Sequence, residues 1–193
     1  MKGRPRTHKD NELVLAAQEI FWRKGYSATS LKDLSAATKA GSGSLYNTFK
    51  GGKKELFKKA LLQRRADLNR FRGQIETADD PIQLIKDFFY SIPKAGKQEH
   101  LKGCIVANTL VEMTFVDDEL REEATRILKE TEELYTAAIR KQQKRGSLKS
   151  TVPAEVLGKY LITFWCGINS LRRMYPNKRI LEQQIVLHLQ VLV

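Results

Sequence analysis

The sequence predicts an all-α protein of about nine helices, three short ones followed by six longer ones. Apolar residues recur at helical spacing through almost the whole chain, and strand-like alternation is nearly absent. Glycine and proline stand where such helices would end or begin. With 193 residues, the chain is long enough to bury a sizeable core.

The first helix is expected over about residues 9–24. Leu13, Ala17 and Phe21 fall on one face of this segment, as in an amphipathic helix. Gly25 follows directly and favours a helix end there.

Two short helices joined by a tight turn are expected next. The sequence Ser30-Leu31-Lys32-Asp33 is a capping box, so the second helix begins after Ser30 and reaches about Thr38. The third runs from Ser42 to about Phe49, with Leu45 and Phe49 on its buried side. Two short helices around a glycine-containing turn, packed on a preceding helix, are the helix-turn-helix arrangement.

The remaining helices form a helical body over residues 53–193. Pro81 and Pro153 suit the first position of a helix, and Gly146 suits the end of one. The predicted helices cover about residues 53–76, 81–92, 103–115, 117–145 and 153–175, and a last one begins near 178.

The formal net charge of +12 is spread unevenly along the chain. Residues 1–60 hold 13 basic and 5 acidic side chains, a net of +8, whereas residues 61–193 hold 21 and 17, a net of +4. This asymmetry indicates a polyanion-binding module joined to a more neutral body, although a lysine-rich solvated surface has the same composition.

Several protein classes are excluded by composition. No apolar run approaches the roughly 18 residues that cross a bilayer, so an integral membrane protein is not expected. Two cysteines cannot form a disulfide framework, which favours the reducing cytoplasm. His8, His100 and His188 have no nucleophile or metal-ligand partner at a recognised spacing, so we expect neither an enzyme nor a metal or other cofactor.

The third predicted helix has the chemistry of a DNA-contacting element. Its start, Gly41-Ser42-Gly43-Ser44, carries little side-chain bulk, so backbone N–H groups and the positive helix end can approach a phosphate. Ser42, Ser44, Tyr46 and Asn47 offer hydrogen bonds to phosphates and base edges. Lysines at 50, 53 and 54 follow at once. The alternative is a polar helix that only faces solvent.

These residues resemble the N-terminal domain of the tetracycline-repressor-like (TetR) family. The resemblance is dense over about residues 3–60 and rests above all on Gly43-Ser44-Leu45-Tyr46-Asn47-Thr48-Phe49. Over the body it is carried by Lys102-Gly103-Cys104, Glu112 and Gly167-Ile168-Asn169-Ser170-Leu171. It implies a homodimeric, nine-helix bacterial transcriptional regulator, usually a repressor that a small molecule releases. Residues 1–52 would then be the DNA-binding domain with its basic arm, and residues 53–193 the ligand-binding and dimerisation domain.

The resemblance also implies roles for individual residues. It assigns major-groove contacts to Ser42, Gly43 and Ser44, and phosphate contacts to Ser30, Tyr46, Asn47 and Lys53, while Arg4 and Arg6 belong to an arm that enters the minor groove. Two positions depart from the family pattern. Ser42 stands where Lys or Arg is frequent, and Gly51-Gly52 lengthens the turn before Lys53 by one residue, which affects the reach of that lysine.

The last two helices are the expected dimer interface. Their apolar stripes suit either an interface or the domain's own core, and we expect the pair of helices to form a twofold dimer that binds a palindromic operator. The stripes comprise Leu157, Leu161, Phe164, Ile168 and Leu171, then Ile185, Leu189 and Leu192.

An aromatic or hydrophobic effector is expected in the body. Aromatic side chains with a few polar groups are typical of ligand cavities, although such stripes are more often core. The candidates are Phe89, Cys104, Asn108, Glu112, Met113, Phe115, Phe164, Trp165 and Asn169. Glu112 would need a partner if buried, and a cationic or hydrogen-bonding ligand, Arg172 or Arg173 are the alternatives.

Two further interpretations stay open. Cys104 follows Lys102-Gly103 at a helix start, where a thiol pKa is lowered, so a redox- or electrophile-sensing repressor is one alternative and a small buried residue is the other. An architectural DNA-binding protein without an inducer would share the basic N-terminal part and would need no cavity.

Overall fold

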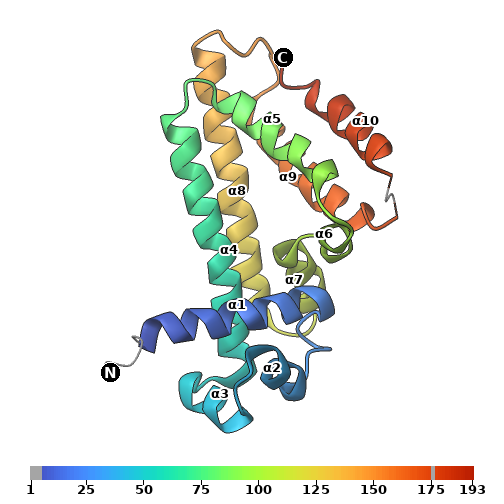
Figure 1. The fold of residues 1–193 in the computed structure, drawn as a ribbon. Coiled ribbons are helices and arrows are strands. Elements are labelled where there is room, and N and C mark those ends of the chain that lie inside the picture. Colours follow the sequence, from blue (N-terminus) through green and yellow to red (C-terminus); the bar gives the residue numbers. More distant parts are fainter. Residues whose placement is uncertain (1–5, 175–176) are drawn as a thin grey trace.

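The structure is a computed structural model that describes residues 6–174 and 177–193, with side chains from residue 10 onward. Within these ranges it contains ten α-helices, one 3-10 turn and no strand, so the predicted all-α class is confirmed. Figure 1 shows a long helical body with a smaller unit at one end.

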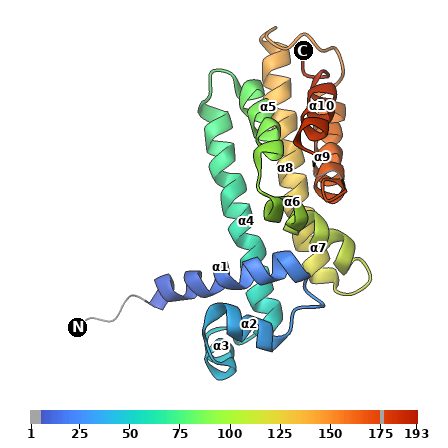
Figure 2. The same cartoon turned by 45° about the vertical axis from the view of Figure 1, so that its right-hand side comes forward.

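The smaller unit, which we call the head, consists of α1 (Arg6–Lys24), α2 (Leu31–Thr38) and α3 (Ser42–Thr48). In Figures 1 and 2, α1 lies across the first turns of α4, with α2 and α3 on its far side. The second helix ends at Lys39, whose φ of 54° is left-handed and turns the chain sharply toward α3. This is the expected helix-turn-helix, with bounds within one residue of those predicted for α2 and α3.

The body begins with α4 (Gly52–Thr77) and continues through α5 (Pro81–Ser91), the 3-10 turn η1 (Ile92–Lys94), α6 (Lys97–Lys102) and α7 (Ile105–Met113). It ends with α8 (Asp118–Lys144), α9 (Ala154–Leu171) and α10 (Lys178–Leu189). Both views show α4 and α8 side by side, with α9 and α10 on the other side of α8. The helix absent from the prediction is α6, whose six residues lie between Gly96 and Gly103.

Buried apolar side chains form two separate cores. The lower core joins α1–α3 and the first half of α4 to α7 and the start of α8. Its members are Leu13, Val14, Ala17, Phe21, Leu34, Leu45, Phe49, Leu56, Phe57, Ala60, Leu61, Cys104, Ile105, Val106, Ala107, Met113, Leu120, Ala124 and Ile127. The head therefore shares its interior with the body.

The upper core lies within the body alone. It runs from Ile75 of α4 to Leu192 and includes the aromatic residues Phe89, Tyr135 and Phe164. Leu68 and Trp165 pack against both cores and form the apolar connection between them. The predicted division of the chain at residue 52 stays a prediction, because the lower core is continuous across it.

Candidate nucleic-acid interface and effector region

Ser30 and Asp33 fix the start of α2. The Ser30 hydroxyl accepts a hydrogen bond from the Asp33 N–H (3.1 Å), and the Asp33 carboxylate accepts one from the Ser30 N–H (2.9 Å). A hydrogen bond from Lys24, followed by those from Ser30, lowers the pKa of Asp33 below its usual range. The Ser30 hydroxyl also donates to Asp33 (2.7 Å), so its proton is engaged before any phosphate arrives.

The first turn of α3 is open to solvent. Ser42, Gly43 and Ser44 are exposed, and a Cβ added to Gly43 would meet no atom within 4 Å. The N-cap residue Gly41 has no side chain to cap the free N–H groups of this turn. Ser42 Oγ lies 3.2 Å from Ser35 Oγ and links α3 to α2. These N–H groups and hydroxyls are therefore available to an anion.

The opposite face of α3 anchors it. Leu45 and Phe49 are 4% and 2% exposed within the lower core, whereas Tyr46, at 51%, and Asn47 face outward. Ser42, Gly43, Ser44, Tyr46 and Asn47 are thus all exposed, and their contact with DNA stays a prediction. Arg4 and the side chain of Arg6 lie outside the described residues, so their predicted minor-groove role stays a prediction.

Lys53 is turned toward the α1–α2 loop. Gly52 adopts a positive φ of 63° in the lengthened turn, and Lys53 follows it in the first turn of α4. Its Nζ lies 4.4 Å from the centre of the Tyr26 ring and donates to the Ser27 carbonyl at 3.5 Å. Burial lowers the pKa of Lys53, and the negative charge of Glu112 partly opposes that effect. Lys53 would have to leave these contacts to bind a phosphate directly.

Glu112 connects the body to the same loop. Its carboxylate, on α7, accepts hydrogen bonds from the backbone N–H groups of Tyr26 (3.0 Å) and Ser27 (2.7 Å). Gly25 has a φ of 81°, and a Cβ there would lie 2.9 Å from Glu112 Oε2, so only glycine fits this contact. The alternative that Glu112 pairs with Arg172 or Arg173 is wrong, since two backbone amides of the head bind its carboxylate. Its predicted role in a ligand cavity stays a prediction.

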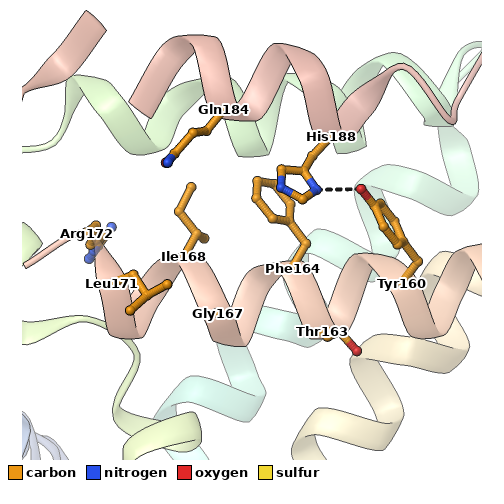
Figure 3. A pocket seen from close by; sticks show the side chains of 9 residues that line it. All are labelled: Tyr160, Thr163, Phe164, Gly167, Ile168, Leu171, Arg172, Gln184 and His188. Carbon is orange, nitrogen blue, oxygen red and sulfur yellow. Dashed lines mark hydrogen bonds between the residues drawn. The ribbon is translucent and has the colours of Figure 1, made fainter. Parts of the chain in front are cut away.

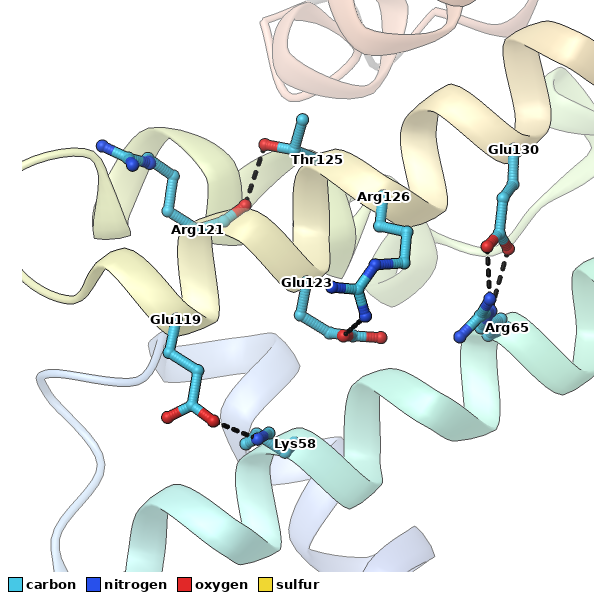
Figure 4. Close-up of polar contacts among 8 residues, drawn as sticks. All are labelled: Lys58, Arg65, Glu119, Arg121, Glu123, Thr125, Arg126 and Glu130. Atoms are coloured by element: carbon cyan, nitrogen blue, oxygen red, sulfur yellow. Dashed lines mark hydrogen bonds and ion pairs between the residues drawn. The ribbon is translucent and has the colours of Figure 1, made fainter.

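Ion pairs fasten α4 to α8 along their length. Arg65 donates to both oxygens of Glu130, with Nε at 2.8 Å, and Lys58 pairs with Glu119 (Figure 4). Nearer the head, Lys54 lies 2.8 Å from both Asp117 and Glu119, and those hydrogen bonds raise its pKa. Lys54, which follows α3 in the sequence, is thereby held by the body.

The nine predicted effector-binding residues do not surround one cavity. Cys104 and Met113 belong to the lower core, Phe89 and Phe164 to the upper core, and Trp165 touches both. Phe115 belongs to neither core, because it lies beyond the end of α7 and is 99% exposed. The effector-binding role of the nine residues stays a prediction.

The two amides of the set bind the backbone around the ends of α6 and α9. Asn108 Nδ2 donates to the Lys102 carbonyl (3.1 Å), and Asn169 Nδ2 donates to the Trp165 carbonyl (2.8 Å). Asn169 Oδ1 is buried and has no hydrogen-bond partner among the described residues.

The predicted dimer stripes are mostly part of the upper core. Within one chain, Leu157, Leu161, Phe164, Ile168, Ile185, Leu189 and Leu192 are all buried. Leu171 is the exception, at 49% exposed. Helical periodicity identified a buried face correctly, but that face packs against the chain's own helices.

Cys104 is the N-cap residue of α7 and is 9% exposed. The second cysteine, Cys166, is also a free thiol, and burial followed by the proximity of Cys104 raises its pKa to about 11. At neutral pH, Cys166 is therefore the protonated and less nucleophilic form.

A cavity that sequence analysis missed lies between α9 and α10. Its volume is about 280 Å³, and the polar residues that line it are Tyr160, Thr163, Arg172, Gln184 and His188 (Figure 3). The sequence signal available was the pair Arg172-Arg173 after an apolar helix, which was interpreted only as a partner for Glu112. Across the described ranges, no helix is both long and apolar enough to span a bilayer.

Comparison with known families covers most of the chain. A family model described as "Bacterial regulatory proteins, tetR family" matches residues 13–60. A second, "Tetracyclin repressor-like, C-terminal domain", matches residues 81–186. Both describe regulators, which are not enzymes, in agreement with the sequence-based expectation.

Individual relatives match along nearly their whole length. The HTH-type transcriptional repressor DhaR of Mycobacterium sp. (strain GP1) is 27% identical over 191 residues, covering 97% of this chain and 94% of that protein. A transcriptional regulator of the TetR family from Cytophaga hutchinsonii is 17% identical and superposes with a TM-score of 0.84, over 99% of this chain and 96% of the other. A cysteine mutant of the regulator CifR, solved with 26bp double-strand operator DNA, is 22% identical, with a TM-score of 0.82 over 99% of this chain and 100% of the other.

Proposed function

The chain belongs to the TetR family of bacterial regulatory proteins, and from this premise we propose that it represses transcription as a homodimer on a palindromic operator and is released by a small molecule. The observation that carries the proposal is the exposed first turn of α3, with its uncapped N–H groups on a rigidly anchored helix. Such a regulator acts on bacterial DNA in the cytoplasm.

The exposed residues of α3 divide into two kinds of DNA contact. Ser42, Gly43 and Ser44 approach base edges in the major groove, where hydroxyls and a bare backbone fit closely. Tyr46 and Asn47 bind the flanking phosphates and set the register. Ser30, at the start of α2, contacts a phosphate of the DNA backbone, and Lys53 reaches another phosphate after leaving the Tyr26 ring.

The outward faces of α9 and α10 form the proposed dimer interface. Val156 and Met174 are 53% and 67% exposed around α9, and Val186 and Leu187 are 49% and 64% exposed on α10. Exposed apolar side chains on two adjacent helices favour association with a second copy. A twofold dimer then places the two α3 helices on half-sites about one DNA turn or a multiple of it apart.

The shared lower core offers a route for release. Glu112 and the lower core connect the head to α7, so a shift of α7 changes the α1–α2 loop that precedes the capping box. An effector bound in the body therefore has a physical connection to the DNA-contacting helix.

The two alternatives are less well supported. A redox repressor needs a reactive thiolate, whereas Cys104 is buried and the pKa of Cys166 is raised. An architectural DNA-binding protein needs no cavity in its body, and this body has one.

Selection of bound sites from a random duplex library, followed by anisotropy titrations at several salt concentrations, tests the DNA contacts. Tyr46→Ala and Lys53→Ala should weaken binding to all sequences alike and reduce the salt slope, while changes at Ser42 or Ser44 should alter the preferred site. If all four variants keep wild-type affinity, slope and preference, DNA does not bind at α3.

A further inference from the structure

The cavity between α9 and α10 has one charged end. In Figure 3, Arg172 lies at the end nearest the close of α9 and Tyr160 lies at the other, with Phe164 and Ile168 between them. The lining is largely apolar, and its volume of about 280 Å³ is near the lower end of the range for small-molecule sites. Gly167 is one of the lining residues, and a Cβ added to it would meet no atom within 4 Å.

Arg172 is a buried cation that lacks a hydrogen-bonded carboxylate among the described residues. Its side chain is 6% exposed, its Nη2 donates only to the carbonyls of Glu99 and Gly103, and its Nε has no partner. The carboxylate whose charge acts on it, that of Glu99, is 55% exposed and lies 3.9 Å from Lys102. Buried charges in proteins are normally paired, so this guanidinium is suited to an anion that enters the cavity.

Two ring side chains, His188 and Tyr160, lie at the end of the cavity away from Arg172 (Figure 3). The His188 ring stacks on Phe164, with centroids 4.0 Å apart, and it is hydrogen-bonded to the Tyr160 hydroxyl. Gln184, on α10, lies between these rings and Arg172, and its amide makes no hydrogen bond within the described part of the chain (Figure 3). One end therefore carries the Arg172 charge, and the remainder is apolar with a few hydrogen-bonding side chains.

We propose that this cavity binds a small organic carboxylate with an aromatic or apolar body. The carboxylate pairs with the Arg172 guanidinium at the cavity wall, and the body packs on Phe164, Ile168 and Leu171. This inference rests on the proposed function, for which it supplies the chemical class of the effector.

The site also has a direct connection to the head. The Gly103 carbonyl accepts a hydrogen bond from Arg172 (3.5 Å) and another from the Trp22 indole of α1 (3.0 Å). Gly103 has a φ of 66°, and a Cβ there would lie 2.5 Å from the Asn169 carbonyl oxygen. The connection between α6 and α7 is therefore packed closely against the backbone of α9. An anion that moves the Arg172 guanidinium changes the hydrogen bonding of the carbonyl that holds Trp22.

The test is calorimetric titration of the full-length protein, without DNA, at fixed ionic strength. The probe is 1-naphthoate, compared with its neutral isostere 1-naphthamide and with acetate, which has the charge without the body. We expect naphthoate to bind at least about tenfold more tightly than either, as for a hydrogen bond to a charged group. Equal affinity for the amide would overturn the proposal.

Three variants locate the site. Arg172→Gln should weaken naphthoate binding about tenfold or more. Arg173→Gln is the matched control. Among the described residues Arg173 donates hydrogen bonds to the backbone carbonyls of Leu101 and Lys102, but it does not line the cavity. The affinity of this variant for naphthoate should stay within about twofold of wild type. Gly167→Leu adds a bulky side chain to a residue of the cavity wall, where a Cβ meets no atom within 4 Å, and should abolish binding.

Several outcomes would contradict the assignment. Wild-type affinity in Arg172→Gln would show that the arginine serves only to hold α6. If that variant does not fold, naphthoate binding retained by Gly167→Leu overturns the site instead. Analytical ultracentrifugation of Gly167→Leu and wild type gives a further check. A monomeric variant beside a dimeric wild type would show that a second copy of the chain fills the cavity.

The same titration separates this proposal from the proposed function. Naphthoate that binds but leaves the selected operator complex intact supports the site and contradicts release. Failure to select any operator contradicts the repressor assignment and does not affect the calorimetry.

Discussion

The lower core and the upper core differ in what they connect. The lower core runs from Leu13 of α1 to Ile127 of α8, so the DNA-contacting helices share an interior with the body. The upper core holds α5, α9 and α10 against α8 and lies entirely within the body. The head therefore has no core of its own, and the geometry of α3 depends on residues far away in the sequence.

The difference also separates two tasks. Damage to the lower core should change stability and DNA binding together, whereas damage to the upper core should change stability and effector binding. Leu68 and Trp165, which touch both, are the apolar route from one to the other.

The largest expected effect on the free energy of unfolding comes from truncating one aromatic residue in each core. Phe57 (1% exposed) packs edge-on against Phe21 at 4.8 Å, and Phe89 (0% exposed) stacks on Phe164 at 5.3 Å. Phe57→Ala and Phe89→Ala should each reduce the free energy of unfolding by about 3–5 kcal/mol. Urea denaturation measures this.

DNA binding should distinguish the same two variants. Titrated at a temperature where both are folded, Phe57→Ala should bind the selected operator more weakly, and Phe89→Ala should bind it as wild type does. Equal losses of affinity would mean that the two cores act as one. Phe57→Leu is the milder substitute where the alanine variant does not accumulate.

A smaller effect is expected at the contact between head and body. Glu112→Gln removes the charge that accepts from the Tyr26 and Ser27 amides and should cost about 1.5–3 kcal/mol, with a matching loss of operator affinity of about tenfold or more. Denaturation and anisotropy titrations measure the two quantities.

Glu19→Gln is the control for this contact. Glu19 also links the head to the body, since its carboxylate lies 3.0 Å from Lys102 Nζ, but its side chain is 47% exposed. Removing this charge should lower the free energy of unfolding by only about 0–1 kcal/mol. Equal effects of the two variants on DNA binding would show that net charge, and not the position of the loop, is what matters.

The smallest effect concerns pH. His100, which is buried on α6 near Arg172, has its pKa lowered from 6.5, first by burial and then by the Arg172 charge. The unfolded chain therefore takes up this proton more readily, so stability should fall as pH drops below about 6.5. His100→Gln should make the free energy of unfolding less dependent on pH, by at most the contribution of one titrating proton. Urea denaturation at pH 5.5 and 7.5 measures it, and an unchanged slope would show that His100 is not the group responsible.

Local signals in the sequence predicted the head well. The capping box at Ser30 and Asp33 and the glycine-containing turn before Ser42 depend on neighbouring residues, and α2 and α3 formed as expected. In contrast, Glu112 finds its partners 85 and 86 residues away, and no local pattern names them.

Helical periodicity in the sequence showed which helix faces are buried, but it did not show which helices or chains they pack against. The stripe from Leu157 to Ile168 is buried, yet it packs within its own chain. Aromatic content did not separate core from cavity, since Phe89 is core and Phe115 is at the surface. The α9–α10 cavity depends on how two helices pack against each other, which is a tertiary property.

The exposed first turn of α3 is the part of the molecule on which the proposed DNA contact depends. A carboxylate placed there tests that contact most directly, because the fold leaves room for one. Gly43→Glu adds a side chain where a Cβ meets no atom within 4 Å, and Gly73→Glu does the same on α4, away from the head. Both variants should keep the wild-type circular dichroism spectrum.

Operator affinity by anisotropy is the deciding measurement. Gly43→Glu should weaken it by about 100-fold or more, because a like charge against phosphate costs several kcal/mol, and Gly73→Glu should leave it within about threefold. Wild-type affinity in Gly43→Glu, with the fold intact, would contradict the claim that α3 is the DNA-contacting helix.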